Sequence, residues 1–145
     1  MKYKLLDCTL RDGGYYNNWF FSKKLTQEYL NAMSKAGIKY VELGFRSPKK
    51  NIYKGPNWYT SDEYIEKLSI PKELTIGVMV NVFEITSNSN DIKKTTDLLF
   101  KNSKLSKVKF VRLASHLNEI DNAFKICKLL KKKGYKVGVN LMQIS

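Results

Sequence analysis

The stretch Leu5-Leu6-Asp7-Cys8-Thr9-Leu10-Arg11-Asp12-Gly13-Gly14-Tyr15-Tyr16 holds the residues around which the rest of the chain is interpreted. Apolar and polar residues alternate from Leu6 to Arg11, which predicts a short β-strand from Leu5 to Leu10 with two different faces. The predicted strand runs directly into Arg11, Asp12 and two glycines. An arginine beside aspartates at a strand's end is typical of a site at the carboxyl edge of a parallel sheet. An edge strand with one solvated face explains the same alternation, so both interpretations stay open at this point.

Composition predicts one folded domain. The chain has 145 residues, of which 43% are hydrophobic and 12% aromatic, enough to build a core. We expect no membrane partner, because no apolar run is long enough to span a bilayer and the N-terminus does not have the pattern of a signal peptide. Cys8 and Cys127 lack metal-ligand spacing, so we expect reduced thiols and a cytoplasmic protein.

The net charge of +13 comes almost entirely from lysines spread along the chain. Such a charge can serve nucleic-acid binding. The densest run, 131–133, however, falls at the end of a predicted helix, where cations interact favourably with the helix dipole. The arginines Arg11, Arg46 and Arg112 all lie in or just after predicted strands, and arginine suits bidentate recognition of an anion. We therefore expect solvated lysines, no nucleic-acid partner and arginines that are placed for function.

The rest of the chain alternates between predicted helices and strands. The further predicted strands are 39–45, 74–82, 108–114 and 137–142. The predicted helices open at Ser22, at Thr60 with Glu63 as a capping box, at Asp91, and at Asn118 or Asp121. Loops are predicted at 13–21 and 47–59, and a polar loop after the strand 74–82. This order predicts an α/β fold with a parallel sheet and right-handed crossovers.

Five strands cannot close an eight-stranded barrel, which needs roughly 200 residues or more. The sheet is therefore either open and doubly wound or part of a (β/α) barrel. Each predicted strand places polar groups on one face while the opposite face stays apolar, and this repetition favours a site over a solvated edge. The predicted polar face contains Asp7, Thr9, Arg11, Glu42, Arg46, Asn81, Arg112, His116 and Asn140.

The chemistry of these groups suggests a metal and an anion. Asp12 and Glu42 are hard oxygen donors that suit Mg²⁺ or Mn²⁺. Arg11 and Arg112 suit a carboxylate or a developing enolate oxygen. His116 is the only histidine of the chain, and it is either a loop or helix-cap residue or a functional one.

The segment Asp7-Cys8-Thr9-Leu10-Arg11-Asp12-Gly13-Gly14 resembles the signature of the metal-dependent pyruvate-aldolase and acyl-lyase superfamily. That superfamily includes 4-hydroxy-2-oxovalerate aldolase, hydroxymethylglutaryl-CoA lyase and isopropylmalate synthase. Val41-Glu42-Leu43-Gly44 and Val111-Arg112-Leu113-Ala114-Ser115-His116 are similar to the second-strand and fourth-strand segments of the aldolase branch. The resemblance follows the whole chain in order.

The resemblance implies that residues 1–145 form a single partial TIM-barrel domain with about five strands and four helices. It implies that Asp12 binds Mn²⁺ or Mg²⁺ and that Arg11 stabilises the enolate of a 2-oxo acid while a carbon–carbon bond is broken or made. We therefore expect a divalent-metal-dependent aldolase or lyase acting on a small 2-oxo acid. The expected catalytic residues are Arg11, Tyr15 and Glu42, the expected substrate-binding residues are Arg112, His116 and Asn140, and the expected metal ligand is Asp12.

Two departures from the family pattern matter. The family's His-x-His metal ligands would lie beyond Ser145. A half-barrel would also expose two strand edges and an apolar face, so we expect either a homo-oligomer or a completing C-terminal half. Tyr15 stands where the 4-hydroxy-2-oxovalerate aldolases carry a histidine base, which leaves the general base and the substrate open. Two alternatives also stay open: a truncated, non-catalytic relative that binds a small acid or a partner chain, and an acyl-CoA-cleaving or condensing member of the superfamily.

Overall fold

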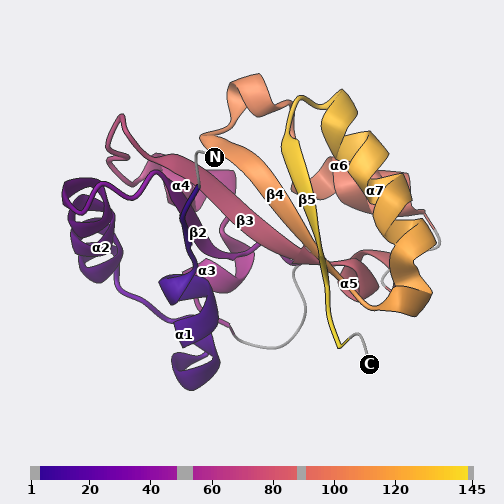
Figure 1. The fold of residues 1–145 in the computed structure, drawn as a ribbon, viewed down its shortest axis with the longest axis horizontal. Coiled ribbons are helices and arrows are strands. Elements are labelled where there is room, and N and C mark those ends of the chain that lie inside the picture. Colours follow the sequence, from indigo (N-terminus) through magenta and orange to yellow (C-terminus); the bar gives the residue numbers. More distant parts are fainter. Residues whose placement is uncertain (1–3, 49–53, 88–90, 144–145) are drawn as a thin grey trace.

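The computed structural model describes residues 4–48, 54–87 and 91–143, whose strands form one parallel sheet in the order β1-β2-β3-β4-β5. The strands are β1 Leu6–Asp7, β2 Tyr40–Phe45, β3 Thr75–Asn81, β4 Val108–Ser115 and β5 Lys136–Leu141. Because strand order follows chain order, right-handed crossovers place the connecting helices on one side of the sheet. A doubly wound sheet requires the order to reverse, so that alternative is excluded. The strands form a curled half-barrel between α2 at one end of the molecule and α7 at the other (Figure 1).

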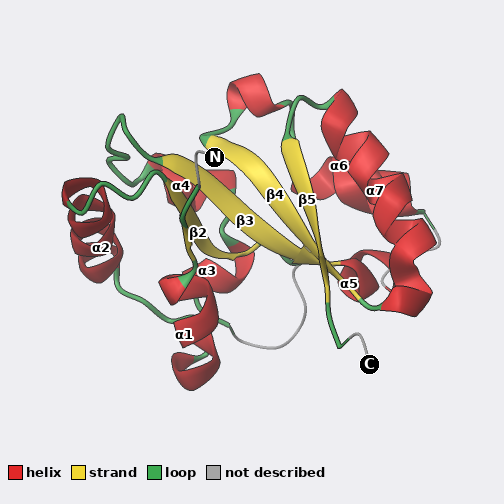
Figure 2. Cartoon of the chain, viewed as in Figure 1, coloured by secondary structure: helices red, strands yellow, loops and turns green. Residues whose placement is uncertain are grey.

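The predicted alternation of helices and strands is confirmed for the described residues (Figure 2). Ser22 caps α2, its Oγ accepting a hydrogen bond of 3.1 Å from Leu25 N. Gly37 and Gly134 end α2 and α7 with φ of 75° and 89°, a conformation that favours glycine. The helices are α1 Thr9–Asn17, α2 Lys23–Lys35, α3 Pro56–Tyr59, α4 Asp62–Glu66, α5 Val82–Ser87, α6 Ile92–Leu99 and α7 Ile120–Lys132, with 3₁₀ turns at Ser103–Leu105 and Leu117–Glu119.

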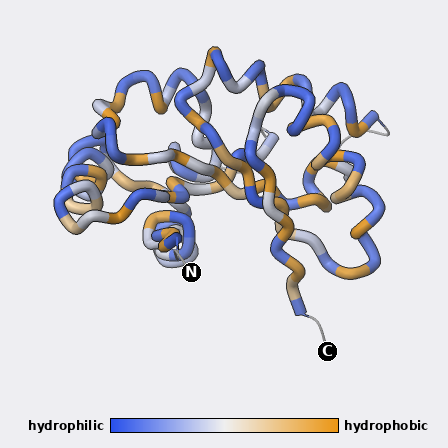
Figure 3. The backbone as a smooth tube through the Cα atoms, turned by 45° about the horizontal axis from the view of Figure 1, so that its top comes forward, coloured by the Kyte–Doolittle hydropathy of each residue, from blue (hydrophilic) through white to orange (hydrophobic). Residues whose placement is uncertain are grey.

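The main hydrophobic core lies between the sheet and the helices. Alternate residues of each strand enter it, such as Val41 and Leu43 of β2, because successive side chains of a strand point to opposite faces. Each of the longer helices packs one apolar side against the sheet. Hydrophilic and hydrophobic residues accordingly alternate along the helical backbone (Figure 3). The residues between them on the strands, such as Glu42, point away from the helices, and we call that side of the sheet the inner face.

The predicted strand Leu5–Leu10 is wrong, because the strand ends at Asp7 and α1 begins at Thr9. The Asp7 carboxylate turns the chain by accepting hydrogen bonds from Thr9 N at 2.9 Å and Thr9 Oγ1 at 3.2 Å. The predicted loop 13–21 likewise begins inside α1, in spite of its two glycines. A Cβ on Gly14 would overlap the Trp19 ring, so this glycine is needed for the aromatic side chain to pack against the helix.

The loop 47–59 contains α3, and its residues 49–53 lie outside the described part of the chain. The capping box predicted at Thr60 is displaced by one residue, since Ser61 Oγ accepts the hydrogen bond from Tyr64 N at 3.2 Å. Thr60 instead ends α3 in the left-handed region with φ of 35°.

Two further elements differ from the sequence prediction. The predicted polar loop after β3 begins as α5, which starts directly at Val82. The helix predicted to open at Asn118 or Asp121 begins at Ile120, after a 3₁₀ turn at Leu117–Glu119. No helix of the described residues has the length and apolar character needed to cross a membrane.

Candidate functional site

A buried carboxylate on β2 is the centre of the candidate site. The Glu42 side chain is 0% exposed and points to the inner face. Its Oε1 accepts hydrogen bonds from Arg11 Nε at 2.9 Å and Arg112 Nη2 at 2.8 Å, and its Oε2 accepts one from Arg112 Nε at 2.7 Å. A buried charge is costly unless it is paired and hydrogen-bonded, so Glu42 and the two guanidinium groups stabilise one another.

Three separate elements bring this cluster together. Arg11 lies in the first turn of α1, Glu42 in the middle of β2, and Arg112 in the middle of β4. Gly77 of β3 lies in register with Glu42 of β2 and with Phe110 of β4, and the Phe110 ring fills the space that a side chain at Gly77 would occupy. The structure therefore places Arg11, Glu42 and Arg112 together, as the sequence predicted for three residues of one site.

Cys8 lies beside the same cluster, with its Sγ 3.4 Å from Arg112 Nη2. Burial, and then the negative charge of Glu42, raises the pKa of the Cys8 thiol to about 11. Cys8 is therefore a neutral thiol at pH 7, and it is not set up as a nucleophile. The hydrogen bonds to Glu42 raise the pKa of Arg112 above its ordinary value, so this guanidinium stays charged.

Asp12 and Tyr15 occupy the open side of α1 next to Arg11. Asp12 Oδ1 lies 2.6 Å from Arg11 Nη1, and its side chain is 61% exposed. Tyr15 is three residues further along the helix, so its side chain lies beside that of Asp12. The Tyr15 ring packs edge-on against Trp19 with a centroid separation of 4.7 Å, yet the residue is 67% exposed.

An aromatic cluster that was not predicted from the sequence packs beside Arg11. Trp19 Nε1 donates a hydrogen bond of 2.9 Å to the Arg11 carbonyl oxygen. The Trp19 ring packs on Trp58 at 4.5 Å and on Phe45 at 5.6 Å, and the Arg11 guanidinium lies 5.8 Å from the Phe45 centroid. The available signal was the run of aromatic residues directly after the Arg-Asp pair.

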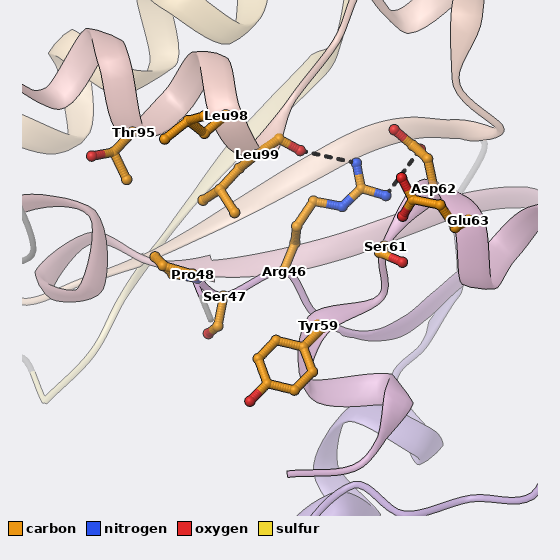
Figure 4. Close-up of a pocket in the computed structure, with 10 residues that line it drawn as sticks. All are labelled: Arg46, Ser47, Pro48, Tyr59, Ser61, Asp62, Glu63, Thr95, Leu98 and Leu99. Carbon is orange, nitrogen blue, oxygen red and sulfur yellow. Dashed lines mark hydrogen bonds and ion pairs between the residues drawn. The ribbon is translucent and has the colours of Figure 1, made fainter. Parts of the chain in front are cut away.

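The prediction that Arg46 shares the inner face with Glu42 is wrong. The register of β2 with β3 shifts between Glu42 and Phe45, so a bulge there turns Phe45 inward and Arg46 toward the helices. Arg46 Nη2 donates to Thr60 O at 2.7 Å and to Asp62 Oδ1 at 3.2 Å. The guanidinium lies against a cavity of about 460 Å³ between the end of β2, α4 and α6 (Figure 4).

Asp7 and Thr9 also leave the predicted inner face. Tyr29 of α2 donates a hydrogen bond to Asp7, so this carboxylate faces the helix layer. Burial alone would raise the pKa of Asp7, but the hydrogen bonds from Tyr29 and Thr9 outweigh it and lower that pKa. The two residues fix the turn that leads into α1, and they place Arg11 and Asp12 indirectly.

The remaining predicted residues lie further along the same strands. Asn81, Ala114 and Asn140 are in register across β3, β4 and β5, so both asparagines share the inner face with Arg112. His116 follows β4, and its backbone N–H is bound by Glu119 Oε2 at 3.0 Å. A cavity of about 420 Å³ contains His116 and Asn81 in its lining. The substrate-binding roles of His116 and Asn140 stay predictions.

The described residues do not form a complete metal site by themselves. Among them, no three His, Cys, Asp or Glu side chains group closely enough to hold a metal ion. The Glu42 oxygens are engaged by two guanidinium groups, whereas Asp12 is exposed and one of its oxygens bonds Arg11. Of the two predicted oxygen donors, Asp12 is therefore the one whose surroundings suit a metal ligand.

A solved structure similar to the chain supports an aldolase-like fold. No protein-family model matches the chain, and no curated protein matches it. A similar solved structure is the N-terminal domain of a proposed aldolase from Bacteroides vulgatus, which is 33% identical and superimposes with a TM-score of 0.86 over 98% of this chain. The chain spans 45% of the length of that solved chain. It therefore has an aldolase-like fold, and it corresponds to less than half of that neighbour.

Proposed function

We propose that the chain carries part of the active site of an aldolase-type carbon–carbon lyase that acts on a 2-oxo acid within a TIM barrel. The observation that supports this most is the pair of arginines from α1 and β4, held by one buried glutamate on the inner face. The similarity to the Bacteroides vulgatus protein supports the same class of reaction.

The two guanidinium groups bind and orient the anionic substrate. Each has five N–H donors, and Glu42 accepts from one donor of Arg11 and two of Arg112. Arg11 Nη1 also pairs with Asp12, and Arg112 Nη2 also contacts the Cys8 thiol. The donors that remain suit the carboxylate of a 2-oxo acid and the oxygen that gains charge as an enolate forms. Glu42 acts as a positioning residue, because its own oxygens are occupied by the arginines.

Asp12 supplies one ligand to a divalent cation, Mn²⁺ or Mg²⁺. When bound, such a cation acts as a Lewis acid on the 2-oxo carbonyl. Arg11 lies between this carboxylate and Glu42, so it holds positive charge beside the reacting oxygen. Tyr15, next to Asp12 on α1, places a phenolic hydroxyl where it hydrogen-bonds the substrate or moves a proton.

The test is an assay of pyruvate release from a 4-hydroxy-2-oxo acid in the presence of Mn²⁺. Because the chain spans 45% of the solved neighbour chain, the assay uses a joined protein, in which the full chain replaces the matched part of the Bacteroides vulgatus chain and the rest of that chain is kept. We expect pyruvate release, and a fall of about 100-fold or more in kcat for Asp12→Asn and for Arg11→Lys. The control is Asp121→Asn, at an exposed carboxylate of α7.

A folded joined protein that releases no pyruvate contradicts the proposal. Release that is equal in wild type, Asp12→Asn and Arg11→Lys contradicts the assigned roles. Binding of the 2-oxo acid without its cleavage would instead identify a non-catalytic relative that binds a small acid.

A further inference from the structure

A cavity of about 420 Å³, which we call the end cavity, lies at the carboxyl ends of β3 and β4. Asn81, Phe83, His116, Asn118 and Glu119 line it. Asn81 is the last residue of β3, and Phe83 follows in the first turn of α5. The other three residues belong to the turn after β4.

Hydrogen bonds within the chain use only part of the polar groups in this lining. Asn81 Oδ1 accepts from Phe83 N at 3.0 Å, so the amide nitrogen of Asn81 keeps two N–H donors for a ligand. The His116 side chain accepts a hydrogen bond from the Glu119 backbone, so its other ring nitrogen carries the proton and can donate. Glu119 Oε2 accepts from His116 N at 3.0 Å, which leaves Oε1 as an acceptor. The end cavity therefore offers both donors and acceptors.

The charges of the lining favour a neutral ligand. Among the described residues that line the end cavity there is no lysine or arginine, and Glu119 adds a carboxylate. A phosphate or a carboxylate group would lie beside this negative charge without a cation to pair with it. A hydroxyl group is uncharged, and it both donates and accepts hydrogen bonds. The ring of Phe83, which is 59% exposed, adds an apolar surface for the C–H groups of the same ligand.

The strand register places the end cavity directly beyond the two arginines. Met79 of β3 is in register with Arg112, and Asn81 is in register with Ala114. Asn81 therefore lies two residues, or ~7 Å, further toward the carboxyl end of the sheet than Arg112. The carboxyl ends of the strands are where the active site of a TIM barrel opens. A substrate whose carboxylate is bound by the arginines brings its far end to Asn81 when it extends in that direction.

We propose that the end cavity binds hydroxyl groups at the far end of the substrate, so that the substrate is a polyhydroxylated 2-oxo acid and not an alkyl one. The inference rests on the aldolase reaction proposed above. That reaction breaks the bond between the third and fourth carbons of the acid. The hydroxyl on the fourth carbon loses its proton and becomes an aldehyde, and the bonding electron pair forms the pyruvate enolate, which takes up a proton at the third carbon. The fragment held in the end cavity is thus a hydroxylated aldehyde.

The first experiment compares two substrates of equal chain length in the joined protein with Mn²⁺. They are 4,5,6-trihydroxy-2-oxohexanoate and 4-hydroxy-2-oxohexanoate. We expect kcat/KM to be about 100-fold higher for the trihydroxy acid, roughly tenfold for each additional hydroxyl group, because a site that hydrogen-bonds a hydroxyl rejects the analogue that lacks it. Equal values, or a preference for the alkyl acid, overturn the inference and leave the proposed reaction intact.

A matched pair of variants locates the contact. Asn81→Asp keeps the oxygen that accepts from Phe83 N and removes the two N–H donors, so it should lower the ratio of the two kcat/KM values about tenfold. Asn31→Asp makes the same change at an exposed position of α2 and should leave the ratio unchanged. Circular dichroism checks that each variant folds, and Asn118→Ala replaces Asn81→Asp if the latter does not. A ratio that stays unchanged in the folded variant contradicts the assigned cavity.

The second experiment needs no catalysis. His116 is the only histidine of the chain, so its ring protons give NMR signals that no other residue contributes. The full chain is titrated with erythritol and with 1-butanol up to about 0.1 M, which covers millimolar dissociation constants. We expect a saturable shift of the His116 signals with erythritol alone, reduced in Asn81→Asp. No shift with erythritol overturns the inference, whether or not the joined protein releases pyruvate. A saturable shift without pyruvate release supports the cavity and contradicts only the proposed reaction.

Discussion

At the residue scale, Glu42 explains why two arginines from distant segments lie together. The Arg-Asp pair, Glu42 and Arg112 were predicted as parts of one site from their types and positions. The hydrogen bonds that join them were not predicted, because residues 70 positions apart meet only through the tertiary structure. A strand pattern assigns a face to a residue, but it does not identify the partner on that face.

Removing Glu42 should destabilise the fold strongly. Glu42→Ala leaves two partly buried guanidinium groups without their partner, which costs about 3–5 kcal/mol for a buried ion pair. Urea unfolding followed by fluorescence measures the loss. The control is Glu28→Ala, whose exposed i,i+4 pair with Lys24 has an N–O distance of 4.0 Å. That pair is worth at most ~0.5 kcal/mol. Equal losses in the two variants would contradict the role given to Glu42.

Cys8 should react with alkylating agents only at high pH. In a Cys127→Ser background Cys8 is the remaining thiol, and the rate of alkylation by iodoacetamide reports its thiolate. Because burial and Glu42 raise the pKa of Cys8 to about 11, the rate should still be rising at pH 10. A plateau that is reached below pH 9 would show that the thiol is not buried beside a negative charge.

At the element scale, the sequence patterns predicted four of the strands well and the first strand poorly. The ends of β2 to β5 differ from the predicted ranges by at most one residue. The error at Thr9 arose because the Asp7 carboxylate accepts a hydrogen bond from Thr9 N and turns the chain, and such a bond has no periodic signal. The error at Arg46 has a different cause: the bulge after Glu42 breaks the alternation that the prediction assumed.

The stability contributed by the turn between β1 and α1 should decrease at acid pH. Hydrogen bonds hold the folded-state pKa of Asp7 below its ordinary value, so the stability they add is present above about pH 4 and is lost as the pH falls through the folded pKa. We expect the wild type to lose more stability than Asp7→Asn between pH 7 and pH 3, as measured by urea unfolding at both pH values. The same loss of stability in both proteins would contradict a stabilising role for the ionised Asp7 carboxylate.

The two glycines of α1 provide a matched pair of substitutions. A Cβ at Gly14 would overlap the Trp19 ring, so Gly14→Ala should destabilise the protein by about 1–3 kcal/mol. A Cβ at Gly13 would lie 3.7 Å from Phe21 Cζ, an ordinary contact. Gly13→Ala should therefore be neutral or stabilising by up to ~1 kcal/mol through helix propensity. Thermal unfolding distinguishes the two variants, and the reverse order would contradict the packing of α1 on Trp19.

At the scale of the whole molecule, strand order and charge decide the interpretation. The sequence left an open doubly wound sheet and a partial barrel as alternatives, and the consecutive strand order excludes the first. The covering of the inner face could not be predicted from periodicity, because both alternatives contain the same strands and helices. The net charge of +13 has a separate consequence: anions accumulate around the whole surface, whether or not a site binds them.

The most direct test of the central claim is a calorimetric titration of the chain with pyruvate and with oxalate, which resembles the enolate of pyruvate. The titration is done at 0.15 M salt, where the Debye length is about 8 Å and the general field is largely screened. We predict saturable 1:1 binding that Arg112→Lys weakens about tenfold, since it loses a charge-assisted bidentate contact, and that Lys24→Met on exposed α2 leaves unchanged. Binding that Arg112→Lys and Lys24→Met weaken equally, or no saturable binding at all, would contradict an anion site built by Arg11, Glu42 and Arg112.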